Sequence, residues 1–330
     1  MNTDSISFQS VLDVLTSTGK DLPRRYLQQL SDIAPLELQT LLEVWPRVST
    51  SRKLTLLKGL ESLAEEDTLV NFDDFARAIL VDPDPQIRIR AIHLLNECEN
   101  TKLASTYLTM LKDDPDLNVR AEAVNALGLF VDLGELEEIP EKNYHQIEDA
   151  LLAAANGEDD SRIRRAALES LGYSSRLEVS TLIESSFHRE DPVWQASALV
   201  AMGRSADERW EEDVIRSLVN ENDGIRRAAV QAAGELSLKS ARTILLGMHG
   251  EVEDYDVIEA AVWSISQIGG EDVRTFLENM LDQSEDEDQI AYLEEALDNL
   301  AFTEDLDRFD LIAFDPDIDL PDVDEDDEEE

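Results

Sequence analysis

The sequence repeats itself about every thirty residues, and this repeat constrains the fold more than any other feature. Each copy opens with an Asp or Asn, and small and apolar residues then follow at helical spacing. The branched or aromatic residue that marks each copy recurs after 32, 44, 31, 31, 32 and 33 residues, at Ile87, Val119, Ile163, Trp194, Ile225, Val257 and Ile290. The long step contains an insertion at about residues 132–143. Such a period predicts stacked helical units instead of one globular core.

Within each copy, the Asp or Asn ahead of the marker residue predicts the start of a helix, because its side chain can accept a hydrogen bond from the first turn. Small residues follow where neighbouring helices approach closely. Four glycines near the end of the helix predict stops in the left-handed conformation: Gly128, Gly172, Gly203 and Gly234. Other amphipathic stretches lie between these helices, at 103–111, 147–155, 180–187, 213–219, 241–248 and 273–281. Each repeat is therefore predicted to be an antiparallel helix pair that buries its apolar face only against its neighbours.

These copies resemble the HEAT family of α-solenoids, and in particular the short HEAT-like repeats of phycobilin lyase subunits. The resemblance rests on stretches of the type Asp-Pro-x-x-x-Arg-x-x-Ala: Asp82-Pro83 and Asp84-Pro85 precede Arg88, and Pro115-Asp116 precedes Arg120. It covers about residues 82–300. It implies an all-α fold, a right-handed α-α superhelix (a HEAT/armadillo-like solenoid) of about seven or eight helix pairs. Gln195 and Ile258 stand where other copies have Arg, so an Arg–Asp ladder is expected to be interrupted there.

The composition along the chain indicates three parts. Residues 1–50 are predicted to form a divergent helical cap, because the end of a stack must cover apolar surface. The HEAT-like repeats are expected over 51–302. Residues 303–330 hold fifteen acidic residues and one basic residue, and are predicted to be a disordered tail. Within this tail, Phe309 and Phe314 are expected to fold back and cap the last repeat. Alternatively, they dock on a basic-apolar partner or in the groove of the solenoid.

The charge excludes several functions. There are 28 basic and 74 acidic residues, which gives a formal net charge of −46. We expect no nucleic-acid binding, because each phosphate contact would oppose this field. No apolar run is long enough to span a membrane, and the first ten residues lack the pattern of a secretory signal. The chain is therefore expected to be cytoplasmic.

The search for catalytic chemistry finds no motif. None of the four histidines is followed by Glu, and no pair has metal-ligand spacing. This excludes the His-Glu pairs of the di-iron hydroxylases that occur among HEAT-type proteins. There is neither a phosphate-binding Gly-rich loop nor a Gly-x-Ser-x-Gly elbow. Cys98 lies between Glu97 and Glu99, which oppose thiolate formation. We predict no catalytic residue, no cofactor and no metal site. Asp315, Asp317 and Asp319 lack the Gly and Glu of a calcium loop and are interpreted as a solvated acidic run.

Two kinds of residue are candidates for binding a partner. Basic residues recur on the second helices, and Arg165 and Arg227 are candidate partner-binding residues. The arginines one position before them in the repeat are interpreted instead as bridges to neighbouring aspartates. Among the aromatics, Trp210 is flanked by charges and is expected to be partly exposed, whereas Trp194 and Trp263 are expected in the core. Phe309 and Phe314 of the tail complete the set.

The predicted function is a non-catalytic protein–protein interaction scaffold or adaptor. It is expected to bind a protein or peptide with basic patches on its elongated surface. Two alternatives stay open. One is a subunit of a prosthetic-group (bilin) lyase-like enzyme, which only the family resemblance implies. The other is a regulator whose acidic tail mimics a polyanion.

Overall fold

A computed structural model describes residues 7–17, 22–251 and 254–313, and the secondary structure in these ranges is entirely helical. The helices divide into two compact units, residues 1–186 and 187–330. The first unit contains α1 (Phe8–Thr16), α2 (Arg24–Leu27), η1 (Gln28–Leu30), α3 (Pro35–Val44), η2 (Trp45–Arg47), α4 (Thr50–Glu66), α5 (Asp73–Ile79), α6 (Pro85–His93), α7 (Lys102–Asp113), α8 (Leu117–Glu135), α9 (Glu141–Asn156), α10 (Ser161–Leu171) and nearly all of α11 (Leu177–Phe187). The second contains α12 (Pro192–Arg204), η3 (Glu208–Trp210), α13 (Glu211–Ser217), α14 (Asp223–Glu235), η4 (Lys239–Ala241), α15 (Arg242–Glu251), α16 (Tyr255–Ile268), α17 (Glu271–Gln283) and α18 (Glu287–Ala313).

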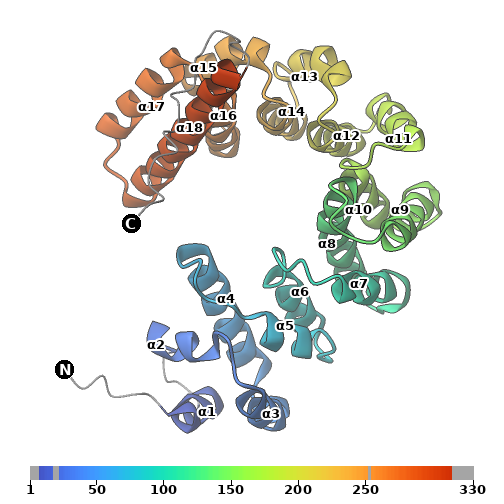
Figure 1. The fold of residues 1–330 in the computed structure, drawn as a ribbon, viewed down its shortest axis with the longest axis vertical. Helices are drawn as coiled ribbons and strands as arrows, with labels where there is room; N and C mark the ends of the chain where they lie inside the picture. The colour runs from blue at the N-terminus through green and yellow to red at the C-terminus, as the bar shows by residue number, and fades with distance from the viewer. Residues whose placement is uncertain (1–6, 18–21, 252–253, 314–330) are drawn as a thin grey trace, which may run out of the picture. The chain divides into compact units, whose positions relative to one another are not determined.

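Each unit is a stack of helix pairs in sequence order (Figure 1). In the first unit the pairs are α5–α6, α7–α8 and α9–α10, and the second helices form one layer in which α6 packs on α8 and α8 on α10. In the second unit the pairs are α13–α14, α15–α16 and α17–α18, and α12, α14, α16 and α18 form the corresponding layer. The fold class predicted from the repeat, an all-α solenoid of helix pairs, is confirmed.

The helix starts follow the predicted chemistry. In six repeats the Asp or Asn ahead of the marker accepts a hydrogen bond from a backbone N–H of the first turn, at Asp84, Asp116, Asp160, Asp191, Asn222 and Asp254. Pro85 and Pro192 occupy the first helical position, where a missing N–H costs nothing. The repeated Asp or Asn therefore fixes where every second helix from α6 to α16 begins.

The prediction that four glycines end helices in the left-handed conformation is wrong. None of the four has a positive φ, and Gly203 and Gly234 lie inside α12 and α14. A Cβ at Gly234 would lie 2.8 Å from the Cα of Ser264 on α16. A Cβ at Gly203 would lie 2.9 Å from the Cα of Ala232 on α14. These glycines allow consecutive second helices to approach closely, and the left-handed residue comes three positions later, at Ala206 and Ser237.

The contacts between second helices include a repeated hydrogen bond. Ser170 Oγ donates to the carbonyl of Val124, at 2.9 Å, and joins α10 to α8. At the equivalent position Ser264 Oγ donates to the carbonyl of Val230, at 2.8 Å, and joins α16 to α14. All four residues are buried, so these bonds lie within the apolar core.

The N-terminal helices pack onto the first repeat through a buried polar group. Asp82 accepts hydrogen bonds from Trp45 Nε1 and from Lys53 Nζ, both at 2.7 Å. Burial alone would raise the pKa of Asp82, but these bonds and one from the N–H of Asp84 outweigh it and lower the pKa. The Trp45 ring also meets Phe75 edge-on, with centroids 5.3 Å apart. These contacts are consistent with a cap over residues 1–50, which stays a prediction.

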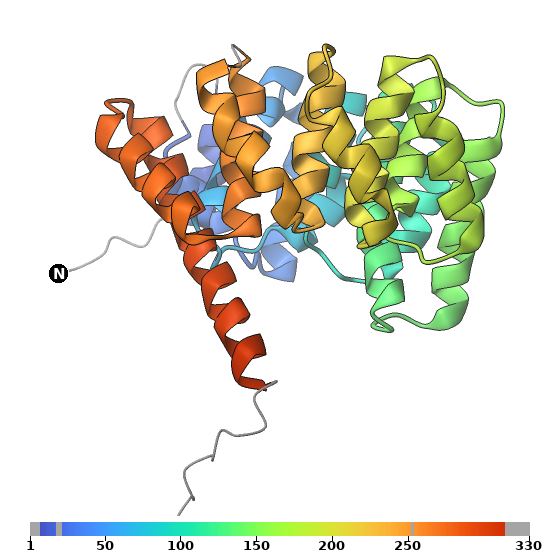
Figure 2. The same cartoon turned by 90° about the horizontal axis from the view of Figure 1, so that it is seen from above.

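Two segments depart from the regular repeat. The insertion at 132–143 lengthens α8 to 19 residues and α9 to 16, and the connection between them lies at 136–140. The expected start of the acidic tail, Thr303, lies inside α18, which extends to Ala313 and runs beyond the other helices of its unit (Figure 2). Residues 314–330, which include Phe314 and the acidic terminus, lie outside the described residues.

Candidate functional surface

The second helices carry side chains that do not pack into the core, and these recur at fixed places in the repeat. They stand two, six and ten positions after the marker residue, a spacing that places them on one face of a helix. In the second unit they are Arg227, Gln231 and Glu235 on α14, and Glu259, Trp263 and Gln267 on α16. Together with Tyr292 of α18 they line a pocket of about 610 Å³.

The pocket of the second unit has aromatic and acidic walls. The rings of Trp263 and Tyr292 lie 6.4 Å apart between centroids with an angle of 33° between their planes, and both side chains are half-buried. Tyr292 Oη donates to the carbonyl of Glu259, at 2.8 Å, which fixes its ring. Burial raises the pKa of Tyr292 to about 12, so its hydroxyl stays protonated.

The charges at this pocket are mostly negative. Arg227 pairs with Asp256 at 3.1 Å, which leaves the carboxylates of Glu235 and Glu259 in excess. The Glu235 carboxylate lies over Gly203, close to where a Cβ on that glycine would stand. Much of the Glu235 side chain is accessible to solvent, but its carboxylate is partly desolvated against α12. This desolvation raises the pKa of Glu235, and the positive charge of Arg204 opposes the rise. The pocket therefore has the charge and the rings to receive a cation.

A corresponding pocket of about 380 Å³ lies on α6, α8 and the turn after α10 in the first unit, lined by residues that include His93, Asn125 and Tyr173. His93 lies between two carboxylates, with Nε2 at 3.5 Å from Glu122 and Nδ1 at 3.9 Å from Glu61. The hydrogen bond with His93 lowers the pKa of Glu122, whereas burial raises that of Glu61. Both units thus present polar, acidic hollows on their second helices.

The arginines beside the marker residue serve the repeat itself, as predicted. Arg88 makes a bidentate bond to Asp114, with Nε and Nη2 at 2.9 and 2.7 Å, and donates to the carbonyl of Asp82. Arg120 pairs in the same way with Asp159 and donates to the carbonyl of Leu111. Each of these arginines therefore bonds a carbonyl of the preceding segment and links one repeat to the next.

The ladder changes where the arginine is missing. At Gln195, Nε2 donates to the carbonyl of Arg189, at 2.8 Å. The glutamine therefore keeps the bond to the preceding loop but brings no charge for a neighbouring carboxylate. This is the interruption that the sequence predicts at this copy.

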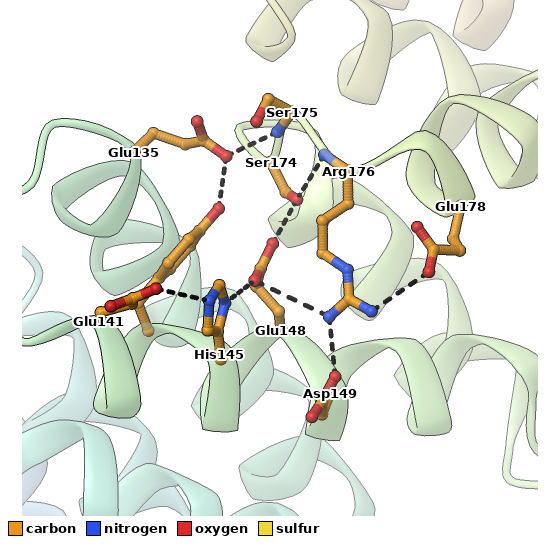
Figure 3. Close-up of polar contacts among 10 residues, drawn as sticks. Glu135, Glu141, His145, Glu148, Asp149, Ser174, Ser175, Arg176 and Glu178 are labelled. Atoms are coloured by element: carbon orange, nitrogen blue, oxygen red, sulfur yellow. Dashed lines mark hydrogen bonds and ion pairs between the residues drawn. The ribbon is translucent and has the colours of Figure 1, made fainter.

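A second polar cluster surrounds Glu148 of α9, whose side chain is fully buried (Figure 3). Ser174 Oγ donates to Glu148 Oε1 at 2.6 Å, and His145 Nδ1 lies 2.9 Å from Oε2. Arg176 lies 3.8 Å from the same oxygen and binds Asp149 at 2.7 Å. The serine bonds the carboxylate and not the histidine, so the two do not form the serine–histidine pair of a catalytic triad. The cluster holds the loop after α10 against α9.

The insertion contributes to this cluster. Tyr144 Oη donates to Glu135, and the same carboxylate accepts the N–H of Ser175 at 2.6 Å. The Tyr144 ring lies against Gly134, where any Cβ would clash with it. Burial and the bond to Glu135 raise the pKa of Tyr144 far above its usual value. The lengthened α8 and α9 are therefore tied together and to the loop after α10.

The surroundings of Cys98 disfavour its thiolate form. It is buried, and its Sγ donates to Asp73 Oδ2 at 2.7 Å. Burial first, and then the bond to Asp73, raise the pKa of the thiol to about 11. The prediction that acidic surroundings oppose the thiolate is confirmed, although the carboxylate in contact is Asp73 and not the sequence neighbours.

The candidate partner-binding residues occupy different environments. Arg227 is exposed and lies on the rim of the second-unit pocket. Arg165 is half-buried on α10, where it bonds Ser161 Oγ at 3.4 Å. The expected exposure of Trp210 is wrong, because the side chain is only 6% exposed and η3 turns it inward among charged neighbours. Phe309 lies in α18 with a side chain outside the described part, and Phe314 lies outside the described residues.

Sequence reasoning missed Trp263 and Tyr292. Trp194 is buried as predicted, because it is itself the marker residue of its repeat. Trp263 was placed in the core by the same argument, but it stands six positions after its marker and is half-buried. The number of positions after the marker residue distinguishes the buried Trp194 from the half-buried Trp263.

Two features are absent from the described residues. No group of three or more His, Cys, Asp and Glu side chains among them is arranged to hold a metal ion. None of the described helices has the length and apolar character needed to cross a membrane.

The comparisons with known proteins agree with the repeat architecture. Residues 74–172 match the family model for HEAT repeats, which covers the pairs from α5 to α10. This part of the chain consists of HEAT repeats. Among curated protein sequences, none matches it significantly. The finer resemblance to the repeats of phycobilin lyase subunits stays a prediction.

Three solved structures show weak likenesses to this chain. The YibA protein of Escherichia coli is 14% identical over 86% of this chain and 99% of its own, with a TM-score of 0.40. Human deoxyhypusine hydroxylase in complex with glycerol is 15% identical over 79% and 95%, with a TM-score of 0.34. A mutant of Kap121p is 15% identical over 96% of this chain and 41% of its own, with a TM-score of 0.43. Likenesses this weak do not transfer an activity or a partner.

Proposed function

We propose that this protein is a protein-interaction scaffold whose second helices bind a protein or peptide with basic patches. The observation that carries the proposal is the surface built at positions two, six and ten of the repeat. In each unit residues at these positions contribute to a pocket that also has acidic and aromatic side chains. Complementary charge would speed the encounter with such a partner and fix its register.

The chemistry of the polar clusters supports a binding role over a catalytic one. The Cys98 thiol is protonated at neutral pH because its pKa is raised to about 11. The Glu148 cluster places its histidine and its serine on the same carboxylate, so neither activates the other. Nucleophilic serines and cysteines are commonly activated by a histidine within hydrogen-bond reach, whereas Cys98 and Ser174 each donate to a carboxylate instead.

The test uses fluorescently labelled, unstructured peptides of equal length that carry positive, zero or negative net charge. Fluorescence anisotropy at low and at high salt should show binding of the positive peptide that weakens as salt rises. Equal binding of all three peptides, or binding of none, would refute the proposal. Co-expression with a bilin pigment, followed by absorbance, tests the alternative of a lyase-like subunit.

A comparison of the full chain with a shortened chain tests the role of the acidic terminus. Because α18 extends to Ala313, the chain should be shortened after that residue and not at 303. If residues 314–330 bind the partner, the shortened chain should lose affinity for the positive peptide. If they cover the end of the stack, the shortened chain should keep its affinity and melt at a lower temperature.

A further inference from the structure

The tryptophans of this chain differ in whether a cation covers their rings. Lys53 lies over Trp45 at 4.7 Å from the ring centroid, Arg189 over Trp194 at 3.9 Å, and Arg209 over Trp210 at 5.6 Å. Within the described part of the chain, the ring of Trp263 has an aromatic neighbour but no such cation. It is also the tryptophan that lines a pocket open to solvent.

The carboxylates around Trp263 would attract a cation to its ring. Of the three carboxylates that line the pocket, only Asp256 is paired, with Arg227. No ion pair or side-chain hydrogen bond within the described residues engages Glu235 or the carboxylate of Glu259. Burial raises the pKa of Glu235, and the attraction of Arg204 only partly offsets this rise. Gln231 and Gln267 add amide oxygens that accept hydrogen bonds.

We propose that the pocket between α14, α16 and α18 binds an arginine side chain of the basic partner, with the guanidinium against Trp263 and paired with Glu235 and Glu259. This inference rests on the proposed function and names the recognition step. Arginine fits better than lysine because its planar guanidinium stacks on an aromatic ring while its N–H groups bond carboxylates. The pocket volume of about 610 Å³ exceeds the need of one side chain, so flanking residues of the peptide also fit.

Intrinsic tryptophan fluorescence provides a local signal. Trp45, Trp194 and Trp210 are 5%, 5% and 6% exposed, so a ligand on the surface reaches Trp263 first. The full chain is titrated with a short glycine–arginine peptide and with its glycine–lysine counterpart at about 0.3 M salt, which suppresses binding to scattered surface acids. We expect the arginine peptide to change the emission and to bind at least about fivefold more tightly, in line with its stacking advantage.

Matched variants separate the pocket from the overall charge. The double variant with Glu235→Gln and Glu259→Gln (the pocket pair) should bind the arginine peptide about tenfold more weakly or worse. This variant lacks both carboxylates that pair with the guanidinium. The pair Glu211→Gln and Glu212→Gln changes the net charge equally on α13, outside this pocket, and should weaken binding less than about twofold. Trp263→Leu should remove the preference for arginine over lysine. Circular dichroism checks that each variant folds.

The titrations of these variants decide whether the pocket binds arginine. A tenfold loss with the pocket pair and little change with the α13 pair support the proposal. Equal losses with both pairs, or no preference for arginine in the unmodified chain, would overturn it. If the longer positive peptide of the anisotropy assay still binds in that case, the scaffold function stands and only the pocket assignment fails. If Trp263→Leu does not fold, the glutamine pairs still decide, because they keep the size of each side chain.

Discussion

Replacing the buried carboxylate of Glu148 tests whether the cluster on α9 stabilises the first unit. Glutamine has the same shape, so Glu148→Gln removes the charge and leaves the packing unchanged. Ser174 Oγ keeps an acceptor, but the new amide group faces the His145 ring and Arg176, where the carboxylate had accepted and paired. Hydrogen bonds to charged groups contribute about 1.5–3 kcal/mol each, so we expect a loss of about 2 kcal/mol in the stability of this unit.

The control variant replaces a second carboxylate that lies near the same histidine. Glu141 lies 3.5 Å from His145 Nε2, but its side chain is 87% exposed. Water screens such a pair, and Glu141→Gln should cost less than about 0.5 kcal/mol. The measurement is urea unfolding followed by circular dichroism, together with hydrogen exchange of peptides that cover α9 and the loop 172–176. If both variants unfold at the same urea concentration, the buried carboxylate does not hold the loop and the reasoning is refuted.

The pH dependence gives a second readout of the same cluster. The hydrogen bond to Glu148 raises the pKa of His145 above its unfolded value. A raised folded pKa means that the contribution is complete below the unfolded value of about 6.5 and is lost as the pH rises through the folded pKa. The penalty of Glu148→Gln should therefore be larger at pH 6 than at pH 9. A penalty that grows with pH would contradict this assignment.

Three further predictions concern packing, thiol chemistry and charge. Gly234→Ala should destabilise the second unit by about 1–3 kcal/mol, because its Cβ would clash with Ser264, whereas Gly247→Ala, which meets nothing within 4 Å, should be neutral or stabilising in thermal unfolding. Cys98 should resist iodoacetamide at pH 7 in the folded chain and react once urea unfolds it, because Asp73 and burial raise the pKa of its thiol; rapid labelling of the folded chain would contradict this. With a net charge of −46, the melting temperature should rise as salt increases from about 0.1 to 1 M and shortens the Debye length from about 10 to 3 Å; a constant melting temperature would show that the acidic surface does not oppose folding.

The helix starts were predictable from sequence because their cause is local. A side chain such as that of Asp116 bonds an N–H two or three residues ahead, and this geometry needs no knowledge of the rest of the fold. The glycines show the opposite case. A glycine near the end of a helix suits both a left-handed stop and a close helix contact. Only the place of α16 beside α14 shows that Gly234 serves the contact.

The candidate sites were less predictable, because burial depends on partners far away in the sequence. Charged neighbours suggested an exposed Trp210, but the neighbours of a residue in a helical turn point in other directions than the residue itself. Glu148 carries no signal among 74 acidic residues, and its partner Ser174 lies 26 positions away. The surface pattern at positions two, six and ten was present in the sequence, and it becomes recognisable once the core position is known from Ile225 and Val257.

The repeat divides its positions between two tasks. One set of positions builds the same helix pair in each copy. It consists of the helix-cap Asp or Asn, the marker residue, the arginine beside it and the small residues that contact the next helix; we call this set the frame. The surface positions differ between copies, as with His93, Asn125, Gln231 and Trp263, which all stand six residues after their marker. An enzyme needs a few groups that converge on one reacting atom, whereas an extended ligand is recognised by different groups at regular intervals. A constant frame that carries variable side chains in a row fits the second requirement, and this is the physical reason to look for a partner along the second helices.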